Sequence, residues 1–145
     1  MNEMELKILS RSENEIFARN AVAAFILPLN PSLSELSDVK TAVSEAVTNA
    51  IVHGYGGSEG WITLRCTTKE NRLHIEISDS GKGIDDVERA QQPFFTTAAE
   101  EERSGMGFTI MQTFMSAFKL QSRSGAGTTV TMEKDFCAKA GSDAR

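Results

Sequence analysis

The segment from Ser34 to His53 carries a helical apolar stripe, and segments with the two-residue period of strands follow it. The stripe recurs at three- and four-residue steps and consists of Val39, Val43, Ala46, Val47, Ala50 and Ile51. Residues 72–79 alternate instead, with apolar side chains at Leu73, Ile75 and Ile77. A helix face and a sheet face must therefore both be buried, and packing one against the other gives a two-layer α/β sandwich.

The remaining segments extend this pattern toward both ends of the chain. Their spacing predicts helices over 14–27 and 107–118, and strands over 4–9, 61–67, 120–122 and 128–134. Strands and helices do not alternate strictly, so we expect an α+β fold with a mixed, mostly antiparallel sheet covered on one face by helices. We also expect a single domain over 1–137 and a disordered tail over 138–145.

Charge and hydropathy exclude several classes of function. The 145 residues carry 15 basic and 20 acidic side chains, and a net charge of −5 disfavours direct binding to nucleic acid. The longest apolar run, Ala21 to Leu27, is too short to cross a membrane, and residues 1–10 lack a signal-peptide pattern. Cys66 and Cys137 form no C-x-x-C, which favours a reducing compartment and leaves a disulfide between them open. We expect a cytoplasmic protein that would affect gene expression by holding another protein.

Glu45 and Asn49 lie four residues apart on the 34–53 helix, one turn apart on the same side. At the edge of the apolar stripe, a carboxylate and an amide can orient a nucleophile and a magnesium ion, because Mg²⁺ prefers oxygen ligands. Taken alone, a Glu-x-x-x-Asn pair is more often two solvated surface residues. A functional role for this pair is supported only together with the motifs that follow it in the chain.

Three glycine-containing motifs follow along the chain. Residues 79–83 (Asp-Ser-Gly-Lys-Gly) place a carboxylate acceptor at a strand end, beside backbone that can turn tightly. Residues 103–108 (Arg-Ser-Gly-Met-Gly-Phe) lead into a helix, whose N-terminal N–H groups favour an anion such as a triphosphate. Residues 125–128 (Gly-Ala-Gly-Thr) open the last strand. Each motif alone also fits an ordinary turn or helix cap, but residues 80–105 form a loop of the length that is usually functional or mobile.

In this order, the four motifs resemble the superfamily named for gyrase, Hsp90, histidine kinases and MutL, over residues 38–134. The closer resemblance is to the anti-sigma factor serine kinases of spore-forming and related bacteria. It is carried by residues 11–19, 44–55, 92–97 and 102–111. The single Gly-x-Gly of the lid agrees with that branch, whereas the acidic run over 100–102 is denser than its pattern.

The resemblance implies that ATP and Mg²⁺ bind between the helical face of the sheet and a short lid. It assigns Glu45 as the general base for a serine hydroxyl and Asn49 as the Mg²⁺ ligand. It also implies that Asp79 holds the adenine amine, helped by Thr128. The other residues it places around ATP or ADP are Gly81, Gly83, Thr97, Arg103, Gly105, Gly107 and Phe108.

The resemblance further implies two protein partners. One is a sporulation sigma factor that is held inactive, and the other is an anti-anti-sigma protein that is phosphorylated on serine. Arg19 matches a partner-binding arginine of the family, although an exposed helix arginine needs no such role. Members of the family act as homodimers, for which the N-terminal strand and first helix are natural contact elements.

Three alternatives compete with this interpretation. A nucleotide-gated sigma-binding module without kinase activity would share the motifs, and Glu45 is the feature that argues for chemistry. A fragment of a sensor histidine kinase would need a phospho-accepting histidine on a helix hairpin, where neither His53 nor His74 lies. A generic α/β domain whose glycines all serve turns is disfavoured by the order of the motifs.

Overall fold

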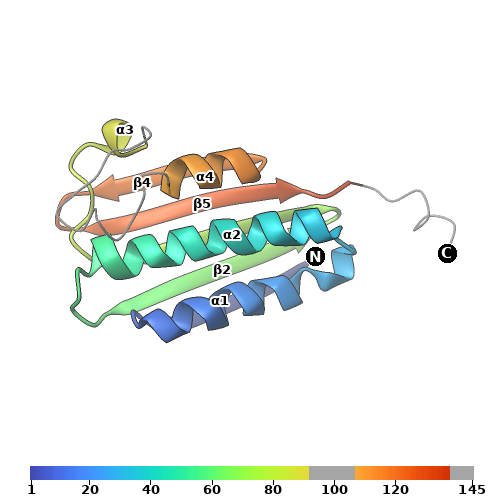
Figure 1. The fold of residues 1–145 in the computed structure, drawn as a ribbon, viewed down its shortest axis with the longest axis horizontal. Helices are drawn as coiled ribbons and strands as arrows, with labels where there is room; N and C mark the ends of the chain where they lie inside the picture. Colours follow the sequence, from blue (N-terminus) through green and yellow to red (C-terminus); the bar gives the residue numbers. More distant parts are fainter. Residues whose placement is uncertain (92–106, 138–145) are drawn as a thin grey trace, which may run out of the picture.

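The computed structural model describes residues 1–91 and 107–137, which form a sheet with helices on one face (Figure 1). The strands are β1 (Asn2–Leu9), β2 (Trp61–Lys69), β3 (Arg72–Asp79), β4 (Ala117–Arg123) and β5 (Gly127–Asp135). The helices are α1 (Ser12–Phe25), α2 (Leu33–Asn49), α3 (Val87–Ala90) and α4 (Gly107–Phe114), with short turns η1 (Leu27–Leu29) and η2 (Ala50–Gly54). The predicted two-layer α+β sandwich is confirmed.

The strand order is β1-β2-β3-β5-β4, and each of the pairings between these described strands is antiparallel. Because β5 pairs antiparallel with β3, the end of β3 meets the beginning of β5. Asp79 is therefore paired with Thr128 on one side and with Ile62 on the other. The sheet topology thus brings two of the glycine-containing motifs together where β3 ends and β5 begins.

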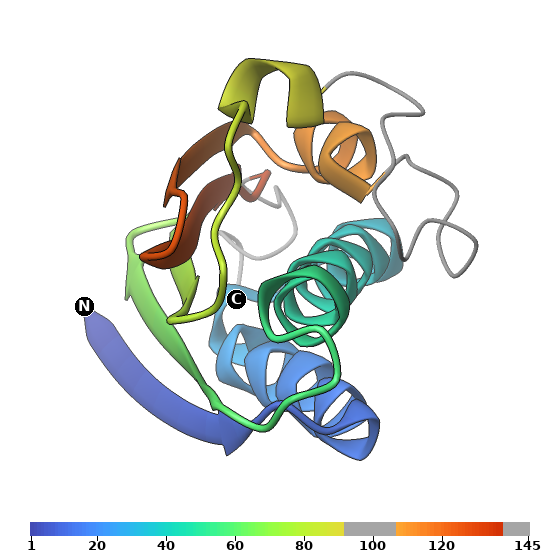
Figure 2. The same ribbon diagram turned by 90° about the vertical axis from the view of Figure 1, so that its left-hand side faces the viewer.

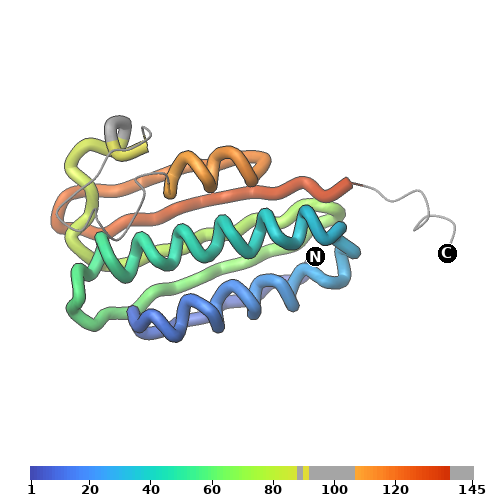
Figure 3. Tube along the Cα trace, in the orientation of Figure 1, coloured from blue at the N-terminus to red at the C-terminus, as the bar shows by residue number. Residues whose placement is uncertain are grey.

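The core lies between the sheet and the row formed by α1, α2 and α4, which run side by side in Figures 1 and 3. The predicted stripe of α2 supplies Val39, Val43 and Val47, which are fully buried against the sheet. On β3, Leu73, Ile75 and Ile77 are buried as their alternation predicts. Burying one such side chain completely stabilises the fold by roughly 1.5–3 kcal/mol, which makes this layer the main source of stability.

Helix α2 begins with a capping box. Ser32 Oγ accepts a hydrogen bond from Glu35 N (3.0 Å), and Glu35 Oε1 accepts one from Ser32 N (2.8 Å). The predicted helix over 34–53 covers α2 and η2, but its last turn is a π-helix rather than an α-helix. Tyr55 N donates to Ala50 O (3.0 Å), which widens that turn at its end.

Two local predictions are wrong. The third helix was predicted to reach Phe118, but α4 ends at Phe114, and Phe118 pairs with Met132 inside β4. Apolar residues at this spacing fit both periods, and the pairing with β5 decides in favour of a strand. The amine of Lys134 on β5 also donates to Phe114 O (2.6 Å) and satisfies a carbonyl at the helix end. In addition, α3 occupies part of the segment that was predicted as loop.

The face of the sheet away from the helices is polar. Arg72 pairs with Glu133 and Asp135, and His74 Nδ1 lies 2.8 Å from Glu133 Oε2. The hydrogen bond to Glu133 raises the pKa of His74, although partial burial opposes that shift. Hydrogen bonds from His74 and Arg72 lower the pKa of Glu133. These charged side chains allow the face to contact water, so it needs no second layer of helices.

Both cysteines are free, which closes the question of a disulfide between them. Cys66 is buried on β2, and its burial raises the pKa of the thiol to about 12, so the thiol is a packing group rather than a nucleophile. No helix among the described residues is long and apolar enough to cross a bilayer. The predicted tail over 138–145 lies outside the described residues.

Candidate functional site

The C-terminal end of α2 carries the first predicted pair. Glu45 and Asn49 are both half-buried and lie one helical turn apart. Asn49 Nδ2 is buried and has no hydrogen-bond partner among the described residues. Because buried amide groups are nearly always hydrogen-bonded in folded proteins, this side chain marks a place where a polar ligand fits.

The π turn after Asn49 brings Gly54 against the predicted adenine-binding carboxylate. A Cβ on Gly54 would lie 2.9 Å from Asp79 Oδ1, so only a glycine leaves that oxygen its space. Asp79 continues the row of Leu73, Ile75 and Ile77 and therefore faces the helices. The end of α2 and the end of β3 thus form one site (Figures 1 and 2).

The carboxyl group of Asp79 is partly buried and therefore partly shielded from water. Burial raises its pKa above the ordinary value of 3.8, while hydrogen bonds from the backbone N–H groups of Gly81 and Thr128 act against that shift. The Gly81 bond to Asp79 Oδ1 is 2.8 Å long. A half-buried carboxylate with few partners is a strong acceptor for an N–H donor such as an exocyclic amine.

Gly81 and Gly83 shape the backbone beside Asp79. A Cβ on Gly81 would lie 2.1 Å from Gly54 O, so no other residue permits this approach of the loop to η2. Gly83 has a φ of +75°, and its Cβ would lie 1.9 Å from Arg123 O. Both glycines are therefore required by the packing around the site, as the D-x-G-x-G motif predicts.

Thr128 lies opposite Asp79 in the β3–β5 register and on the same face of the sheet. Its hydroxyl is 2.8 Å from Ser122 Oγ on β4. The structure therefore brings Thr128, Asp79, Gly81 and Gly83 together.

Gly107 and Phe108 begin α4, which packs beside α2. Gly107 is buried, and the ring of Phe108 lies 6.0 Å from that of Phe118, centroid to centroid. The role of their N–H groups toward phosphates stays a prediction. Three further predicted residues, Thr97, Arg103 and Gly105, lie outside the described residues.

The polar groups at the end of α2 fit a magnesium ion that is held mainly by other ligands. Within residues 1–91 and 107–137, no group of three His, Cys, Asp or Glu side chains could hold a metal ion alone. Mg²⁺ commonly binds through one or two protein oxygens, substrate phosphates and water. The side chain of Asn49 suits that mode, because its amide carries an oxygen that could bind the ion besides the buried Nδ2, which has no partner among the described residues.

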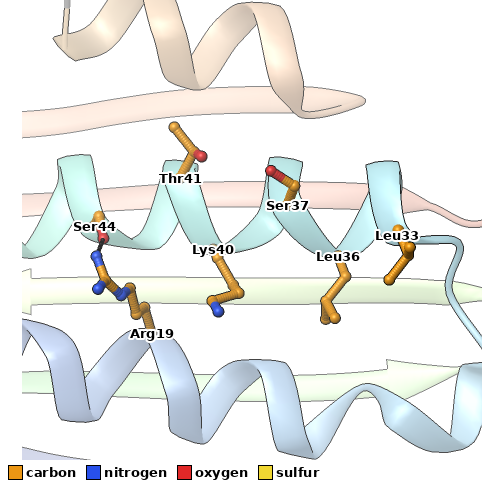
Figure 4. A pocket seen from close by; sticks show the side chains of 7 residues that line it. All are labelled: Arg19, Leu33, Leu36, Ser37, Lys40, Thr41 and Ser44. Carbon is orange, nitrogen blue, oxygen red and sulfur yellow. Dashed lines mark hydrogen bonds between the residues drawn. The ribbon is translucent and has the colours of Figure 1, made fainter.

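Arg19 lies apart from this site, in a groove of about 460 Å³ between α1 and α2 (Figure 4). Its Nη1 is 3.3 Å from Ser44 Oγ and 3.4 Å from Glu15 Oε2. Lys40 and Leu36 point from α2 toward the same groove. Arg19 is thus a partly exposed cation on a surface, and it is not a ligand of the site around Asp79.

Two side chains beside the site, Tyr55 and Ser122, and the contact of Gly54 with Asp79 were not predicted from the motifs. Tyr55 Oη and Ser122 Oγ both bond to backbone around the 79–83 motif. Tyr55 stands inside the segment that carries the family resemblance, so its position was available as a signal. Nothing in the sequence around Ser122 marks it.

The sequence profile described as "Histidine kinase-like ATPase domain" matches residues 11–134. An "Anti-sigma F factor" of Caldanaerobacter subterraneus subsp. tengcongensis is 57% identical over 92% of this chain and 93% of its own length. Another, of Clostridium acetobutylicum, is 50% identical over 93% of this chain and 94% of its own length. The chain belongs to the anti-sigma F factor family of histidine kinase-like ATPases. The family resemblance found in the sequence is confirmed.

Solved structures show the fold of this family in more distant proteins. The crystal structure of the RsbU and RsbW domains of Rv1364c from Mycobacterium tuberculosis matches 97% of this chain and 34% of that chain, with a TM-score of 0.70 and 17% identity. The mycobacterial sensor histidine kinase MprB matches 72% of this chain and 74% of that chain, with a TM-score of 0.54 and 21% identity. Both likenesses concern the fold alone. As an ATPase-domain protein, the anti-sigma F family member described here binds nucleotide.

Replacing Asp79 by Asn tests the adenine side of the site. The substitution removes a charged acceptor, so we expect ADP to bind roughly tenfold to a hundredfold more weakly, measured by isothermal titration calorimetry.

The same substitution also affects stability. The pKa of Asp79 is raised in the folded state, so its ionisation lowers the stability of the fold as pH rises from 3.8 through that raised value. At neutral pH we therefore expect Asp79→Asn to unfold at the same or a higher temperature.

Asp85→Asn is the matched control, because it makes the same charge change at an exposed position of the same loop. It should leave ADP affinity unchanged. Wild-type ADP affinity in Asp79→Asn would show that Asp79 does not hold the nucleotide.

Proposed function

We propose that this protein is an anti-sigma factor that, with ATP, is also a serine kinase for its anti-anti-sigma antagonist. The observation that carries the proposal is the buried Nδ2 of Asn49, which has no hydrogen-bond partner among the described residues, one turn from Glu45 and just before the π turn that brings Gly54 against Asp79. A carboxylate, an amide and a buried acceptor are the groups that phosphoryl transfer from ATP needs for a base, a metal ion and adenine. The family membership supports the same proposal.

In this proposal, Asn49 would bind Mg²⁺ through its amide oxygen, and the ion would neutralise charge on the phosphates when bound. Asp79 and Thr128 would receive the adenine amine, and Gly81 and Gly83 would leave room for adenine and ribose. The N–H groups at the start of α4, at Gly107 and Phe108, would face the phosphates. Roles for Thr97, Arg103 and Gly105 in the lid rest on the family resemblance alone.

Glu45 would act as the general base. The serine Oγ of the protein substrate attacks the γ-phosphorus, the bond from that phosphorus to the β-phosphate oxygen breaks, and ADP leaves. The serine proton passes to the Glu45 carboxylate, directly or through one water. The products are ADP and a phosphoserine, so the reaction is that of a protein serine kinase.

The partner proteins follow from the relatives and from the surface. The relatives that are 50–57% identical are called anti-sigma F factors, which supports a sporulation sigma factor as the sequestered partner. The groove between α1 and α2 offers Arg19 and Lys40 beside the exposed Leu33, a mixture of charge and apolar surface that suits a protein partner. We place the binding of the sigma factor and its antagonist at this groove, in the cytoplasm.

A nucleotide-gated module that only sequesters the sigma factor is the second candidate. It would use the same pocket and the same groove, with Glu45 idle. Transfer of phosphate distinguishes the two candidates.

The first test of the kinase is transfer of labelled γ-phosphate from Mg·ATP to a candidate anti-anti-sigma protein. We expect label on a serine of that protein. Glu45→Ala and Glu45→Gln should slow the transfer by roughly a hundredfold or more, because a general base contributes at least that factor. ADP affinity of both variants should stay at the wild-type value.

Glu13→Gln, on the exposed side of α1, makes the same charge change away from the site and should transfer normally. Wild-type protein that binds ATP tightly yet transfers no label would favour the sequestering module. Full transfer by Glu45→Gln would leave the kinase standing and remove Glu45 as its base.

Arg19→Ala tests the partner surface. Arginines at the centre of interfaces are frequent hot spots, so we expect the substitution to weaken sigma-factor binding about tenfold or more in calorimetry. ADP affinity should not change, because Arg19 lines the groove between α1 and α2, where its side chain contacts Ser44 and Glu15. Arg11→Ala, which removes an exposed arginine paired with Glu59, serves as the control. Equal partner affinity of Arg19→Ala and wild type would place the partner elsewhere.

We also propose a homodimer through the N-terminal elements. Strand β1 is an edge strand of the sheet, and Ile16 and Phe17 on α1 are 51% and 54% exposed. Unpaired strand edges and neighbouring apolar side chains favour association with a second copy. Light scattering should give the mass of two chains, and Phe17→Glu should shift it toward one. A single-chain mass for the wild type at micromolar concentration would contradict the dimer.

A further inference from the structure

The loop Ser80–Ile84, which follows Asp79, is held at both ends by side-chain hydroxyl groups that the proposed chemistry does not use. At its first residue, Ser80 N donates a 2.9 Å hydrogen bond to Tyr55 Oη. At its last residue, Ile84 N donates a 2.8 Å hydrogen bond to Ser122 Oγ. The two hydroxyls come from different elements, one from the residue after the π turn and one from β4.

The hydroxyl group of Tyr55 is held in place by contacts outside the loop. Its Oη also donates to Trp61 O (2.5 Å), so the hydroxyl bridges the beginning of β2 and the end of β3. The ring lies tightly over Gly60, where a Cβ would be 2.3 Å from Tyr55 Cε1. Because the ring packs against the core, the hydroxyl position is set by tertiary packing rather than by the loop itself.

The hydroxyl group of Ser122 makes as many hydrogen bonds as a serine hydroxyl can. It accepts from Ile84 N, donates to Gly127 O (2.9 Å), and pairs with Thr128 Oγ1 (2.8 Å). A serine hydroxyl has one donor and two acceptor sites, and these three bonds fill them. Ser122 therefore links the loop to the same Thr128 that stands opposite Asp79.

Between its ends, the loop is held by one bond from Gly81 N to Asp79 Oδ1 (2.8 Å) and by bonds to backbone groups. Lys82 N donates to Gly54 O (2.9 Å), and Gly125 N donates to Lys82 O (2.5 Å). The loop contains two glycines, and Gly83 has a positive φ, so its own sequence imposes little conformation. The two hydroxyl contacts are the side-chain bonds to the backbone N–H groups of Ser80 and Ile84.

We propose that Tyr55 and Ser122 are positioning residues that hold the Ser80–Ile84 loop in the shape that receives the adenosine part of the nucleotide. This inference rests on the nucleotide site described under the proposed function. Neither residue touches the reacting atoms. Each raises the fraction of nucleotide-free molecules in which Asp79, Gly81 and Thr128 already have the positions that bind nucleotide. Apparent affinity falls in proportion to that fraction when the contacts are lost.

The test compares Tyr55→Phe and Ser122→Ala with Ser78→Ala. The first two remove one hydroxyl each and keep the packing of the remaining atoms. Ser78 is the matched control, because its hydroxyl lies 3.2 Å from that of Thr129 and bridges β3 and β5, the strands of Asp79 and Thr128, on the opposite face of the sheet. Titration calorimetry with ADP should show about tenfold weaker binding for Tyr55→Phe and Ser122→Ala, the effect of one lost hydrogen bond, and no change for Ser78→Ala.

Two readouts separate positioning from a general loss of fold. The binding stoichiometry should stay at one nucleotide per chain, because the variants lower affinity and not the amount of folded protein. In the phosphate-transfer assay, KM for ATP should rise about tenfold while kcat stays near wild type, because Glu45 and the phosphate end are untouched.

Wild-type ADP affinity in both variants would overturn the inference, as would a fall in stoichiometry with unchanged affinity. If Tyr55→Phe does not fold, Ser122→Ala decides alone. If the wild type binds ADP but transfers no phosphate, the kinase proposal fails and the positioning role is still measured by ADP affinity. If the wild type binds no ADP, the nucleotide site is wrong and the inference falls with it.

Discussion

The close contact between Gly54 and Gly81 is the constraint on which the site depends. Lys82 N donates to Gly54 O at 2.9 Å, and no side chain fits between the loop and the end of α2. This contact joins the helical layer to the sheet at the end where the chain leaves β3. Without it, Asp79 would face water instead of the wall formed by Gly54, and its carboxyl group would lose the partly dry position that makes it a selective acceptor.

The alternation of side chains along β3 both supplies core residues and orients Asp79 toward the site. Leu73, Ile75 and Ile77 point into the core, and Asp79 is the next residue of that row. A carboxyl group at the end of an apolar row is costly to ionise, and the N–H groups of Gly81 and Thr128 offset part of that cost. The apolar face of the sheet therefore extends directly into a polar pocket, without a separate scaffold for the pocket.

Helix α2 connects two surfaces that the proposed function uses. Ser44 borders the groove with Arg19, while the adjacent Glu45 and Asn49 belong to the end of the helix that meets Asp79. Successive residues on a helix point about 100° apart, so one element can serve both surfaces. A displacement of α2 when nucleotide binds would also move the groove, which is a physical route by which nucleotide could influence partner binding.

The sequence by itself determined the two layers and the approximate positions of the strands, and its resemblance to a family predicted that Glu45, Asn49, Asp79, Gly81, Gly83 and Thr128 belong to one site. Local periodicity is a property of neighbouring residues, and the order of motifs survives without knowledge of their distances. It misplaced the end of α4, because residues up to Phe118 fit a helix until β5 offers a strand partner. Only the tertiary structure decided the π turn, the approach of Gly54 to Asp79 and the hydroxyl contacts of Tyr55 and Ser122. Apart from the π turn, those features join residues from 25 to 38 positions apart in the chain, as in the bonds of Ser80 to Tyr55 and of Ile84 to Ser122. Such contacts are set by how the layers pack, which no local pattern records.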